Sequence, residues 1–423
     1  MQISNTFLKD KKILLGVTGS IAIYKSVELA RSFVKAGAEV RVIMTQSAKK
    51  FITPLTFETI TSNKVLDDTN ESWADDFNHI QIGMWADVFV IAPATANTIA
   101  KLANAIADNI LTQTALAYPK KKVLAPSANT NMIENPITQA NLKMVAIANY
   151  EIVQPQVKEL ACKTTGNGAM AEVNDIFFAT ARELLSDDFY KDRMVMVTGG
   201  GTIEKIDDVR YISNFSSGKM ASAIATALYC LGADVNLIAT RFESDLPNDI
   251  HTIDVQDTQE MYEYLEDSIR IAKKGKLSKA TLMSSEQIHH IAKKPYLFMA
   301  AAVSDYVPQF AQNGKLKKES LGEVWELKLK KNRDILASIN KEGIVTVGFK
   351  AEMDQQNGLK NAQNMLIKKN IDAVCLNILK DSSSFGTDTN SVEFLTPNSQ
   401  TTLPTQDKLQ LAFKILELSK GLE

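Results

Sequence analysis

Glycines and hydroxyl-bearing residues follow two short apolar runs near the start of the chain, and residues of these types could bind an anion. Gly19 and Ser20 lie in a turn that follows one run and opens a helical pattern, within the segment GVTGSIAIYK. At such a turn the backbone amides of the helix N-terminus point toward a bound anion. Thr45 and Ser47 follow the next apolar run, and we expect their hydroxyl groups to face the same anion. A tight strand-to-helix turn without a ligand explains the glycine equally well.

A third apolar run ends in polar residues ahead of a helix that is rich in small side chains. Its sequence is APATANTIAKLANAIADNIL, in which Pro93, Thr95 and Asn97 begin the helical pattern. Small side chains at this place would let a flat ring approach the backbone. The segment therefore suits a planar ligand.

The second half of the chain contains a longer glycine-rich segment. Three consecutive glycines follow an apolar run, and hydroxyl and amide side chains precede a helix, in TGGGTIEKIDDVRYISNFSSGKM at 198–220. Such a loop can surround an anion with backbone amides. Without further context it is also typical of a dinucleotide-binding turn. The basic run KLKK at 315–318 is, in the same way, typical of a solvated loop.

The runs that carry these residues alternate with amphipathic stretches, which is the pattern of a parallel β-sheet covered by helices. Strands are expected at ILLGV, EVRVIM, DVFVIA, KVLAP, EIVQP, MVMVTGG, DVNLIA, YLFMAA, IVTVGF and DAVCLN. Helices are expected at 21–35, 174–190, 219–231, 256–272 and 359–369. Each half opens with a strand, a glycine-containing turn and a helix, where α/β sheets bind ligands. We therefore predict two α/β domains, at 1–190 and 191–423, with a basic inserted surface loop at 273–294.

Length, composition and charge exclude several classes of protein. The 423 residues exceed what one hydrophobic core usually fills, and the hydrophobic share of 45% and charged share of 23% are those of globular proteins. A net charge of -2 provides no broad basic surface for nucleic acid. The three cysteines form no CxxC pair, and no apolar run suits a signal peptide or a membrane span. We expect a cytoplasmic protein that binds neither nucleic acid nor membranes.

Several motifs of the first half resemble those of the flavin-containing cysteine decarboxylases. They are GSIAIYK, MTQSAKKFI, HI followed by WAD, and APATANTIAK. The resemblance implies a flavodoxin-like, Rossmann-like domain in which FMN lies across the strand ends. It implies FMN contacts at Gly19, Ser20, Thr45, Ser47, Thr95 and Asn97, and catalytic roles for His79, Asn129 and Cys162.

The chain departs from the pattern of this family at four positions. One lies beside Asn129, one in the helix after Asn97, and two in the flap that carries Cys162: Ala128, Ala105, Lys163 and Ala169. Methionine is usual in place of Ala128, and glycine is common in place of Ala105. The flap retains Gly166 and Gly168, so a mobile flap is still expected.

Cysteine decarboxylation requires residues of these types. An N-acyl cysteine carboxylate loses CO2 with difficulty because the carbanion left behind has no adjacent electron sink, and oxidation by a flavin of the carbon that bears sulfur supplies one. A histidine such as His79 can transfer a proton at neutral pH. The amide of Asn129 can hold the carboxylate without a charge that would retain it, and the thiol of Cys162 can return a proton from a closing flap. Outside these motifs a lone histidine is more often structural, and cysteines are usually buried.

The second half resembles the phosphopantothenate-cysteine ligases. The segments AAVSDY, KLKK, KNRDIL and GFKAE follow the glycine-rich loop in the order of that family's motifs. The resemblance implies a Rossmann-like ligase domain in which CTP, with Mg2+, activates the carboxylate of phosphopantothenate as an acyl-cytidylate that the amine of cysteine then attacks. It implies catalytic roles for Asn214 and Lys315, and nucleotide contacts at Asp305, Lys315, Arg333, Asp334, Ile335, Leu336, Phe349 and Lys369. No metal ligand is assigned, and Met365 replaces one family lysine.

Together the halves resemble the bifunctional phosphopantothenoylcysteine decarboxylase/phosphopantothenate-cysteine ligases of coenzyme A biosynthesis, in which the ligase product is the decarboxylase substrate. The resemblance implies small-molecule substrates and a homo-oligomer of trimeric decarboxylase and dimeric ligase parts, together a dodecamer. One alternative is a non-catalytic flavin-binding regulatory protein, against which the retention of His79, Asn129 and Cys162 argues. Another is a pair of dehydrogenase modules, which the absence of a GxGxxG motif followed by an acidic residue disfavours.

Overall fold

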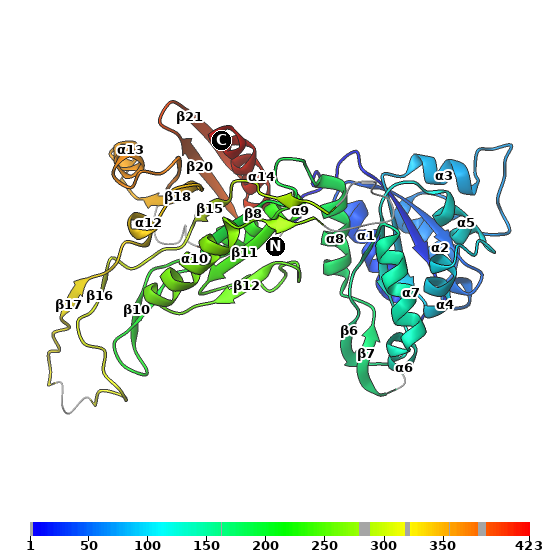
Figure 1. Cartoon of the computed structure of the whole chain (residues 1–423), viewed down its shortest axis with the longest axis horizontal. Coiled ribbons are helices and arrows are strands. Elements are labelled where there is room, and N and C mark those ends of the chain that lie inside the picture. The colour runs from blue at the N-terminus through cyan, green and yellow to red at the C-terminus, as the bar shows by residue number, and fades with distance from the viewer. Residues whose placement is uncertain (1–2, 162, 279–287, 318–321, 355, 380–385) are drawn as a thin grey trace. The chain divides into compact units, whose positions relative to one another are not determined.

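The computed structural model of the protein describes residues 3–161, 163–278, 288–317, 322–354, 356–379 and 386–423. These residues form two compact units, which are described separately (Figure 1). The first unit comprises the described residues of Ile3–Ser186 and of the segment Leu277–His289, and the second comprises those of Asp187–Lys276 and His290–Glu423. In the part of the chain that the structure describes, no helix is both long and apolar enough to cross a bilayer.

The first unit is built around a sheet of five parallel strands in the order β2-β1-β3-β4-β5. This is the strand order of a flavodoxin-like fold. The strands are β1 (Lys12–Val17), β2 (Glu39–Met44), β3 (Val88–Ala94), β4 (Lys122–Pro126) and β5 (Tyr150–Ile152). The helices are α1 (Ile23–Lys35), α2 (Pro54–Thr61), α3 (His79–Trp85), α4 (Ala96–Ala103), α5 (Ile110–Ala117), α6 (Thr130–Glu134), α7 (Pro136–Ile147) and α8 (Val173–Leu185), with a 3-10 turn at Ala48–Lys50.

The sheet is covered by helices on both faces, which is why its strands are apolar without alternation. Leu14 and Phe89 belong to a core cluster that also contains residues of α3, α4, α5 and α7. Successive strand residues point to opposite faces, and on the other side α1 and α8 pack together through Phe33 and Phe177, whose ring centroids lie 5.5 Å apart. An antiparallel hairpin of β6 (Gln156–Glu159) and β7 (Thr165–Ala169) follows the sheet.

The second unit contains an eight-stranded sheet in the order β12-β11-β8-β15-β18-β19-β20-β21. Its first six strands are parallel, and counted along the chain they have the order 3-2-1-4-5-6 of a Rossmann fold. They are β8 (Met194–Gly199), β11 (Asp234–Ala239), β12 (His251–Asp254), β15 (Tyr296–Met299), β18 (Val345–Glu352) and β19 (Ala373–Ile378); the antiparallel strands are β20 (Thr389–Leu395) and β21 (Gln400–Asp407). The helices are α9 (Lys219–Cys230), α10 (Thr258–Ala272), α12 (Ile335–Ser338), α13 (Gly358–Lys368) and α14 (Lys408–Ser419), followed by a 3-10 turn at Lys420–Leu422.

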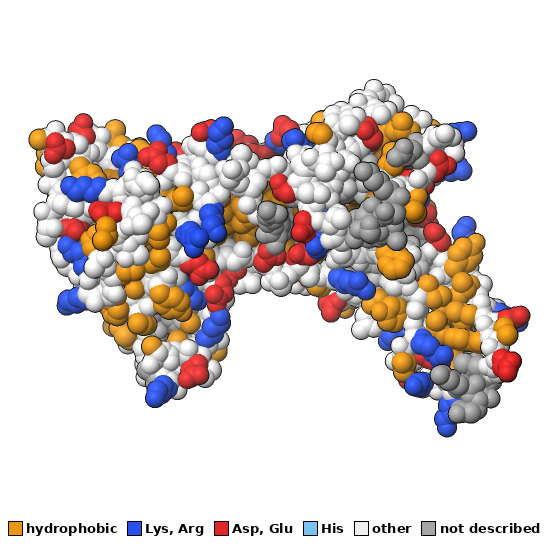
Figure 2. All heavy atoms as spheres, turned by 180° about the vertical axis from the view of Figure 1, so that it is seen from behind, with side chains coloured by type: hydrophobic (Ala, Val, Ile, Leu, Met, Phe, Trp, Pro, Cys, Tyr) orange, Lys and Arg blue, Asp and Glu red, His pale blue; other side chains and the backbone are white. Residues whose placement is uncertain are grey.

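Two short ribbons form an arm of the second unit (Figure 1). They are β9 (Ile203–Lys205) with β10 (Tyr211–Ser213), and β16 (Tyr306–Pro308) with β17 (Leu329–Lys331). β9 and β16 contact each other. Figure 2 shows hydrophobic side chains gathered on this arm, and those exposed there are Val209, Tyr211, Phe215, Tyr306, Phe310, Val324, Trp325 and Leu329.

The predicted α/β architecture of both halves is confirmed, and the differences lie at element ends and in irregular segments. The helix predicted at 174–190 ends at Leu185, because the following residues turn to begin the second unit. The predicted loop at 273–294 contains a two-stranded pairing of β13 (Lys276–Leu277) with β14 (His290–Ile291). β20, β21 and α14 extend the second sheet beyond the predicted strands.

Candidate active sites

A cavity of about 550 Å³ lies in the first unit at the carboxyl ends of the strands. All six residues predicted to contact FMN line it: Gly19, Ser20, Thr45, Ser47, Thr95 and Asn97. They belong to the loops that follow β1, β2 and β3, and Ser127 and Ala128 after β4 complete the wall. At this edge the strand order changes direction between β1 and β3, which opens a crevice between the loops.

Gly19 allows the loop after β1 to lie directly against the loop after β2. A Cβ atom on Gly19 would lie only 2.6 Å from the Cβ atom of Ser47. The hydroxyl groups of Ser20 and Ser127 lie 3.0 Å apart and join the loops after β1 and β4. The cavity wall therefore depends on a residue without a side chain at position 19.

Thr18 links the loops after β1 and β3. Its hydroxyl donates to the carbonyl of Pro93 at 2.7 Å and accepts from the amide of Thr95 at 3.2 Å. The side chain of Thr95 in turn caps α4 by accepting from the amide of Thr98. These bonds hold the start of α4 against the cavity.

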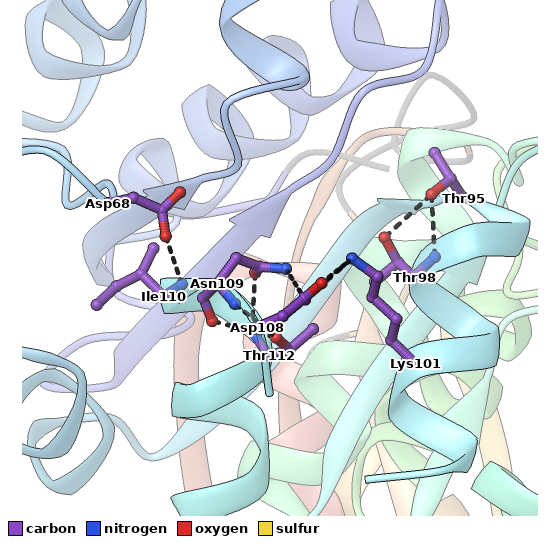
Figure 3. Close-up of polar contacts among 8 residues, drawn as sticks. All are labelled: Asp68, Thr95, Thr98, Lys101, Asp108, Asn109, Ile110 and Thr112. Atoms are coloured by element: carbon purple, nitrogen blue, oxygen red, sulfur yellow. Dashed lines mark hydrogen bonds and ion pairs between the residues drawn. The ribbon is translucent and has the colours of Figure 1, made fainter. Parts of the chain in front are cut away.

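Three charged residues that were assigned no role from the sequence also line the cavity: Asp68, Lys101 and Asp108 (Figure 3). Lys101 lies 2.7 Å from Asp108, which also accepts from the side chain of Asn109 at 2.9 Å. The hydrogen bond from Lys101 holds the pKa of Asp108 below its usual range. Asp68 accepts from the amide of Ile110 at 2.7 Å and so caps α5. Lys101 ends the APATANTIAK motif and Asp108 lies seven residues further on, but nothing in the sequence pairs the two.

The lining of the cavity fits FMN. Hydroxyl groups and amides dominate the lining. Its lysine, Lys101, is neutralised by the ion pair with Asp108. At Gly19 the absence of a Cβ atom leaves room beside the backbone. Hydroxyls and backbone amides at the start of a helix are suitable donors for a phosphate. The volume lies within the range of cofactor pockets.

His79 is the first residue of α3 and lies in a contact of its own. Its Nδ1 atom is 2.6 Å from Oε1 of Glu71, and its backbone amide donates to the same oxygen at 3.2 Å. Asn78 caps the helix by accepting from the amides of Ile80 and Gln81. His79 is not among the described residues that line the cavity of its own chain.

Asn129 follows Ala128 of the cavity wall and caps α6 by accepting from the amide of Asn131 at 3.0 Å. The β6–β7 hairpin packs against this segment, because the amide of Ala128 donates to the carbonyl of Gly168 at 3.1 Å. Cys162, which lies between β6 and β7 in the sequence, is outside the residues that the structure describes. The neighbouring Lys163 has a positive φ of 62°, and Ala169 pairs with Gln156 within the hairpin.

In the second unit the glycine-rich loop and the AAVSDY segment meet at the point where the Rossmann strand order reverses, between β8 and β15. Gly201 and Ala302 form a β-bridge there. The side-chain amide of Asn214 donates to the carbonyls of Ala302 and Val303 at 3.3 and 3.2 Å. Asn214 therefore joins two of the segments that the sequence assigned to the ligase site.

The backbone on either side of Lys315 is held by residues of the glycine-rich loop. The amide of Gly314 donates to Asp208 at 2.7 Å, and that of Leu316 donates to Asp207 at 3.2 Å. Arg210 binds Asp207 and donates to the carbonyl of Leu316 at 3.0 Å; its hydrogen bond is the main reason why the pKa of Asp207 lies well below the usual range. The exposed Lys315 lies between these two anchors, which are the hydrogen bonds of Gly314 and Leu316. Asp207 and Asp208 had not been assigned to the site from the sequence.

The remaining predicted nucleotide contacts divide into an exposed and a buried group. Asp334 caps α12 and forms an ion pair with Lys369 at 2.9 Å. The guanidinium of Arg333 lies 4.1 Å from the ring centre of Tyr262. The amide of Asn332 donates to the carbonyl of Asp305 at 2.8 Å. The side chains of the buried group, Ile335 and Leu336, lie in the hydrophobic core, and Phe349 is half-buried in β18.

Met365, which stands where the ligase family has a lysine, packs against the core. Its Cε atom would lie 2.8 Å from a Cβ atom on Gly348. The side chain thus fills the space that this glycine leaves. Among the described residues, no three His, Cys, Asp or Glu side chains gather as a metal site would require.

Comparison with known proteins identifies the class to which these two units belong. The Flavoprotein family matches residues 1–185, and the DNA/pantothenate metabolism flavoprotein C-terminal domain matches residues 190–274 and 270–421. The chain is therefore a flavoprotein of the pantothenate metabolism class.

Curated relatives narrow this class to one family. Coenzyme A biosynthesis bifunctional proteins from Borreliella burgdorferi, Haemophilus influenzae and Bacillus subtilis are 34%, 36% and 35% identical to the chain. The matches cover 97%, 96% and 97% of the chain and 99%, 96% and 97% of the relatives. The chain belongs to the family of coenzyme A biosynthesis bifunctional proteins. It is a bifunctional enzyme, an FMN-dependent phosphopantothenoylcysteine decarboxylase and a phosphopantothenate-cysteine ligase, as predicted from the sequence.

Two solved structures each match one part of the chain. A PPC decarboxylase mutant complexed with pantothenoylaminoethenethiol is 34% identical, with a TM-score of 0.38, over 41% of this chain and 97% of that chain. The C-terminal domain of a coenzyme A biosynthesis bifunctional protein is 25% identical, with a TM-score of 0.42, over 56% of this chain and 98% of that chain.

Proposed function

We propose that the cavity of the first unit holds FMN and that His79, Asn129 and Cys162 carry out the decarboxylation. The observation that carries this proposal is the convergence of six residues, predicted from three separate motifs, on one cavity at the strand ends. Bound FMN would supply the acceptor for a hydride from the substrate. Ser20, Thr45 and Ser47 would donate hydrogen bonds to its phosphate, and Thr95 and Asn97 would border its ring.

The hairpin and the segment that carries Asn129 would act together on the substrate. The side-chain amide of Asn129 can hold a carboxylate, and the backbone of its neighbour Ala128 is bonded to the hairpin. A closing movement of the hairpin would therefore bring Cys162 toward the same carboxylate and exclude water. In this proposal Cys162 returns a proton to the product and His79 removes one from the substrate thiol.

For the second unit we propose a site at the strand-order reversal that binds CTP with Mg2+. Asn214, which bonds two carbonyls of the AAVSDY segment, would hold the acyl-cytidylate. Lys315, between its two anchors, would neutralise the phosphates. Asp305, Arg333 and Lys369 would contact the nucleotide with their side chains. The buried Ile335 and Leu336 leave only their backbone for such a contact.

Product analysis of the complete protein tests both halves. The protein is incubated with 4'-phosphopantothenate, cysteine and Mg2+, and with either CTP or ATP, and 4'-phosphopantetheine is measured. We expect Cys162→Ser to stop before 4'-phosphopantetheine and Asn214→Asp to impair amide formation. Undiminished 4'-phosphopantetheine from Cys162→Ser would show that another group returns the proton, and equal rates with ATP would refute the preference for CTP.

We further propose that the protein assembles through trimeric decarboxylase and dimeric ligase contacts. The exposed apolar side chains of the arm support the ligase contact. His79, which is absent from the cavity lining of its own chain, supports a decarboxylase site completed by a neighbouring subunit. Light scattering would measure the mass, and Phe310→Glu on the arm should reduce it while Tyr264→Glu, at an exposed position of α10, should not.

The domain boundary at 190/191 and the cytoplasmic location are also part of the proposal. The two family matches leave residues 186–189 between them, which supports a boundary close to the predicted one. The buried free cysteine Cys375 supports a reducing compartment. Limited proteolysis followed by mass spectrometry would locate the boundary.

A further inference from the structure

Glu71 contacts His79 at two points with one carboxylate oxygen. Oε1 of Glu71 accepts from the backbone amide of His79 at 3.2 Å and lies 2.6 Å from Nδ1 of its ring. The ring is also met edge-on by Trp73, with ring centroids 5.7 Å apart and planes at 88°. The orientation of the imidazole is thus set by two neighbouring side chains.

The loop that carries Glu71 is closed by its own hydrogen bonds. Ser72 and Phe77 exchange backbone bonds at 2.9 and 3.0 Å, and the hydroxyl of Ser72 donates to Asp75 at 2.8 Å. Asn78, whose side chain caps α3, is buried. The carboxylate of Glu71 is therefore carried by a short loop whose conformation is held by its own hydrogen bonds.

The contact decides which ring nitrogen carries hydrogen. The hydrogen bond from His79 is the largest cause that lowers the pKa of Glu71, so the carboxyl group is ionised at neutral pH. An ionised carboxylate can only accept, and Nδ1 must therefore be the donor. In the neutral imidazole this leaves the lone pair on Nε2, which can accept a proton.

We propose that Glu71 is a positioning residue for decarboxylation, which holds His79 in the Nδ1–H form with Nε2 free for the substrate. This inference rests on the role proposed above for His79. When the substrate thiol loses its proton, the S–H bond breaks, an N–H bond forms at Nε2, and the electron pair stays on sulfur. The positive charge that develops on the ring lies beside the carboxylate of Glu71, which keeps its hydrogen bond and takes no proton.

The test compares Glu71→Ala and Glu71→Gln in the full-length protein with ¹⁵N-labelled histidine. The chain has four histidines, so the signal of His79 is assigned by its loss in His79→Asn. We expect Glu71→Ala to show a mixture of ring tautomers and a kcat for decarboxylation about 10- to 100-fold lower, with a smaller change in KM. Glu71→Gln, whose amide oxygen can still accept, should keep more of both the Nδ1–H form and the rate.

Asp75→Asn serves as the matched control, because it removes a carboxylate from the same loop without touching His79. It should keep the wild-type tautomer, kcat and FMN content. If Glu71→Ala kept the wild-type tautomer and kcat while His79→Asn was inactive, Glu71 would have no positioning role and the proposed function would stand. Full activity of His79→Asn would instead overturn the proposed role of His79, and the inference with it.

Discussion

At Gly19 the loop after β1 lies directly against the loop after β2 in the flavin site. In Gly19→Ala the new Cβ atom would overlap Ser47, so one loop must move into the space for FMN. We expect FMN affinity to fall at least about tenfold, with a loss of stability of about 1–3 kcal/mol. The ratio of flavin absorbance to protein after purification measures the first effect, and denaturant unfolding the second.

Gly83→Ala is the matched control for this prediction. Gly83 lies within α3, and a Cβ atom there would make ordinary contacts at 3.7 Å with Thr114 and 3.9 Å with Tyr118. Alanine in a helix interior is favoured over glycine by up to about 1 kcal/mol. Retention of full flavin content by Gly19→Ala would contradict the role assigned to this turn.

Ala105 stands in a backbone conformation that favours glycine. Its φ is 55°, and the amide of Ile106 donates to the carbonyl of Lys101 at 2.9 Å, as in a Schellman turn that ends a helix. A left-handed conformation costs an L-residue roughly 1–2 kcal/mol. Glycine avoids this cost, but its greater conformational entropy in the unfolded state cancels part of the gain. We predict that Ala105→Gly raises the free energy of unfolding by about 0.5–1 kcal/mol, measured by urea denaturation. Asn104→Gly, where φ is negative, should lower it.

Lys122 is a buried lysine, 7% exposed, whose described contacts include no carboxylate. Its ammonium group donates to the carbonyl of Tyr118 at 2.8 Å and lies 5.4 and 4.9 Å from the ring centres of Tyr118 and Tyr150. Burial lowers its pKa from 10.5 to about 8. The folded state thus releases this proton at lower pH than the unfolded state does.

The sign of the resulting pH dependence follows from this difference. Between pH 8 and 10.5 the unfolded chain binds a proton at Lys122 that the folded chain has lost, so stability rises with pH in this window. Relative to Lys122→Met, the wild type should gain up to about 3 kcal/mol between neutral pH and about pH 10. Denaturant unfolding at both pH values measures the gain. If the difference in the free energy of unfolding between the wild type and Lys122→Met were the same at both pH values, the prediction would be wrong. Lys120→Met provides a comparison at a more exposed lysine.

At the scale of elements, the β6–β7 hairpin is positioned by two glycines against the segment that carries Asn129. A Cβ atom on Gly168 would lie 2.2 Å from the carbonyl oxygen of Ala128, and Gly168 has a φ of 135°. Gly166 similarly has no room beside Thr130. The hairpin can lie here only because both positions lack side chains.

We predict that Gly168→Ala shifts the hairpin and lowers kcat for decarboxylation at least about tenfold, since a misplaced catalytic group costs rate steeply. FMN content should fall less than kcat, because Gly168 contacts the cavity wall only through Ala128 and neither glycine lines the cavity itself. Single-turnover kinetics and the flavin spectrum separate the two effects. Val157→Ala, at a 69% exposed position of the same hairpin, should behave as wild type; a loss of flavin as large as the loss of kcat in Gly168→Ala would contradict the assignment.

At the scale of the whole molecule, each unit has a hydrophobic core made of its own residues. One described cluster contains residues from Leu14 to Tyr150 and another contains residues from Met196 to Leu395. We predict that fragments 1–190 and 191–423 fold separately, the first binding FMN and the second forming the amide. Flavin absorbance and product analysis test each fragment. A colourless 1–190 fragment would contradict this prediction for the first unit.

The sequence by itself determined the two α/β units, their motifs and their family. Parallel strands buried on both faces are continuous apolar runs, and the turns that follow them carry glycine and hydroxyl residues at fixed offsets. Both kinds of signal are local along the chain. Gly19, Thr45 and Thr95 could therefore be assigned to one site although they are far apart in sequence, because their strand ends had to meet.

Only the tertiary structure decided which side chains bind one another across loops. The pairing of Glu71 with His79, of Lys101 with Asp108, and the anchoring of the KLKK segment by Asp207 and Arg210 follow no periodic pattern. Their partners lie in irregular segments whose paths depend on packing and not on local propensity. The addition of β20 and β21 to the second sheet was missed for a related reason. β21 is polar and largely exposed, and β20 is buried only near its end, so both resemble loops until a neighbouring strand supplies the hydrogen bonds.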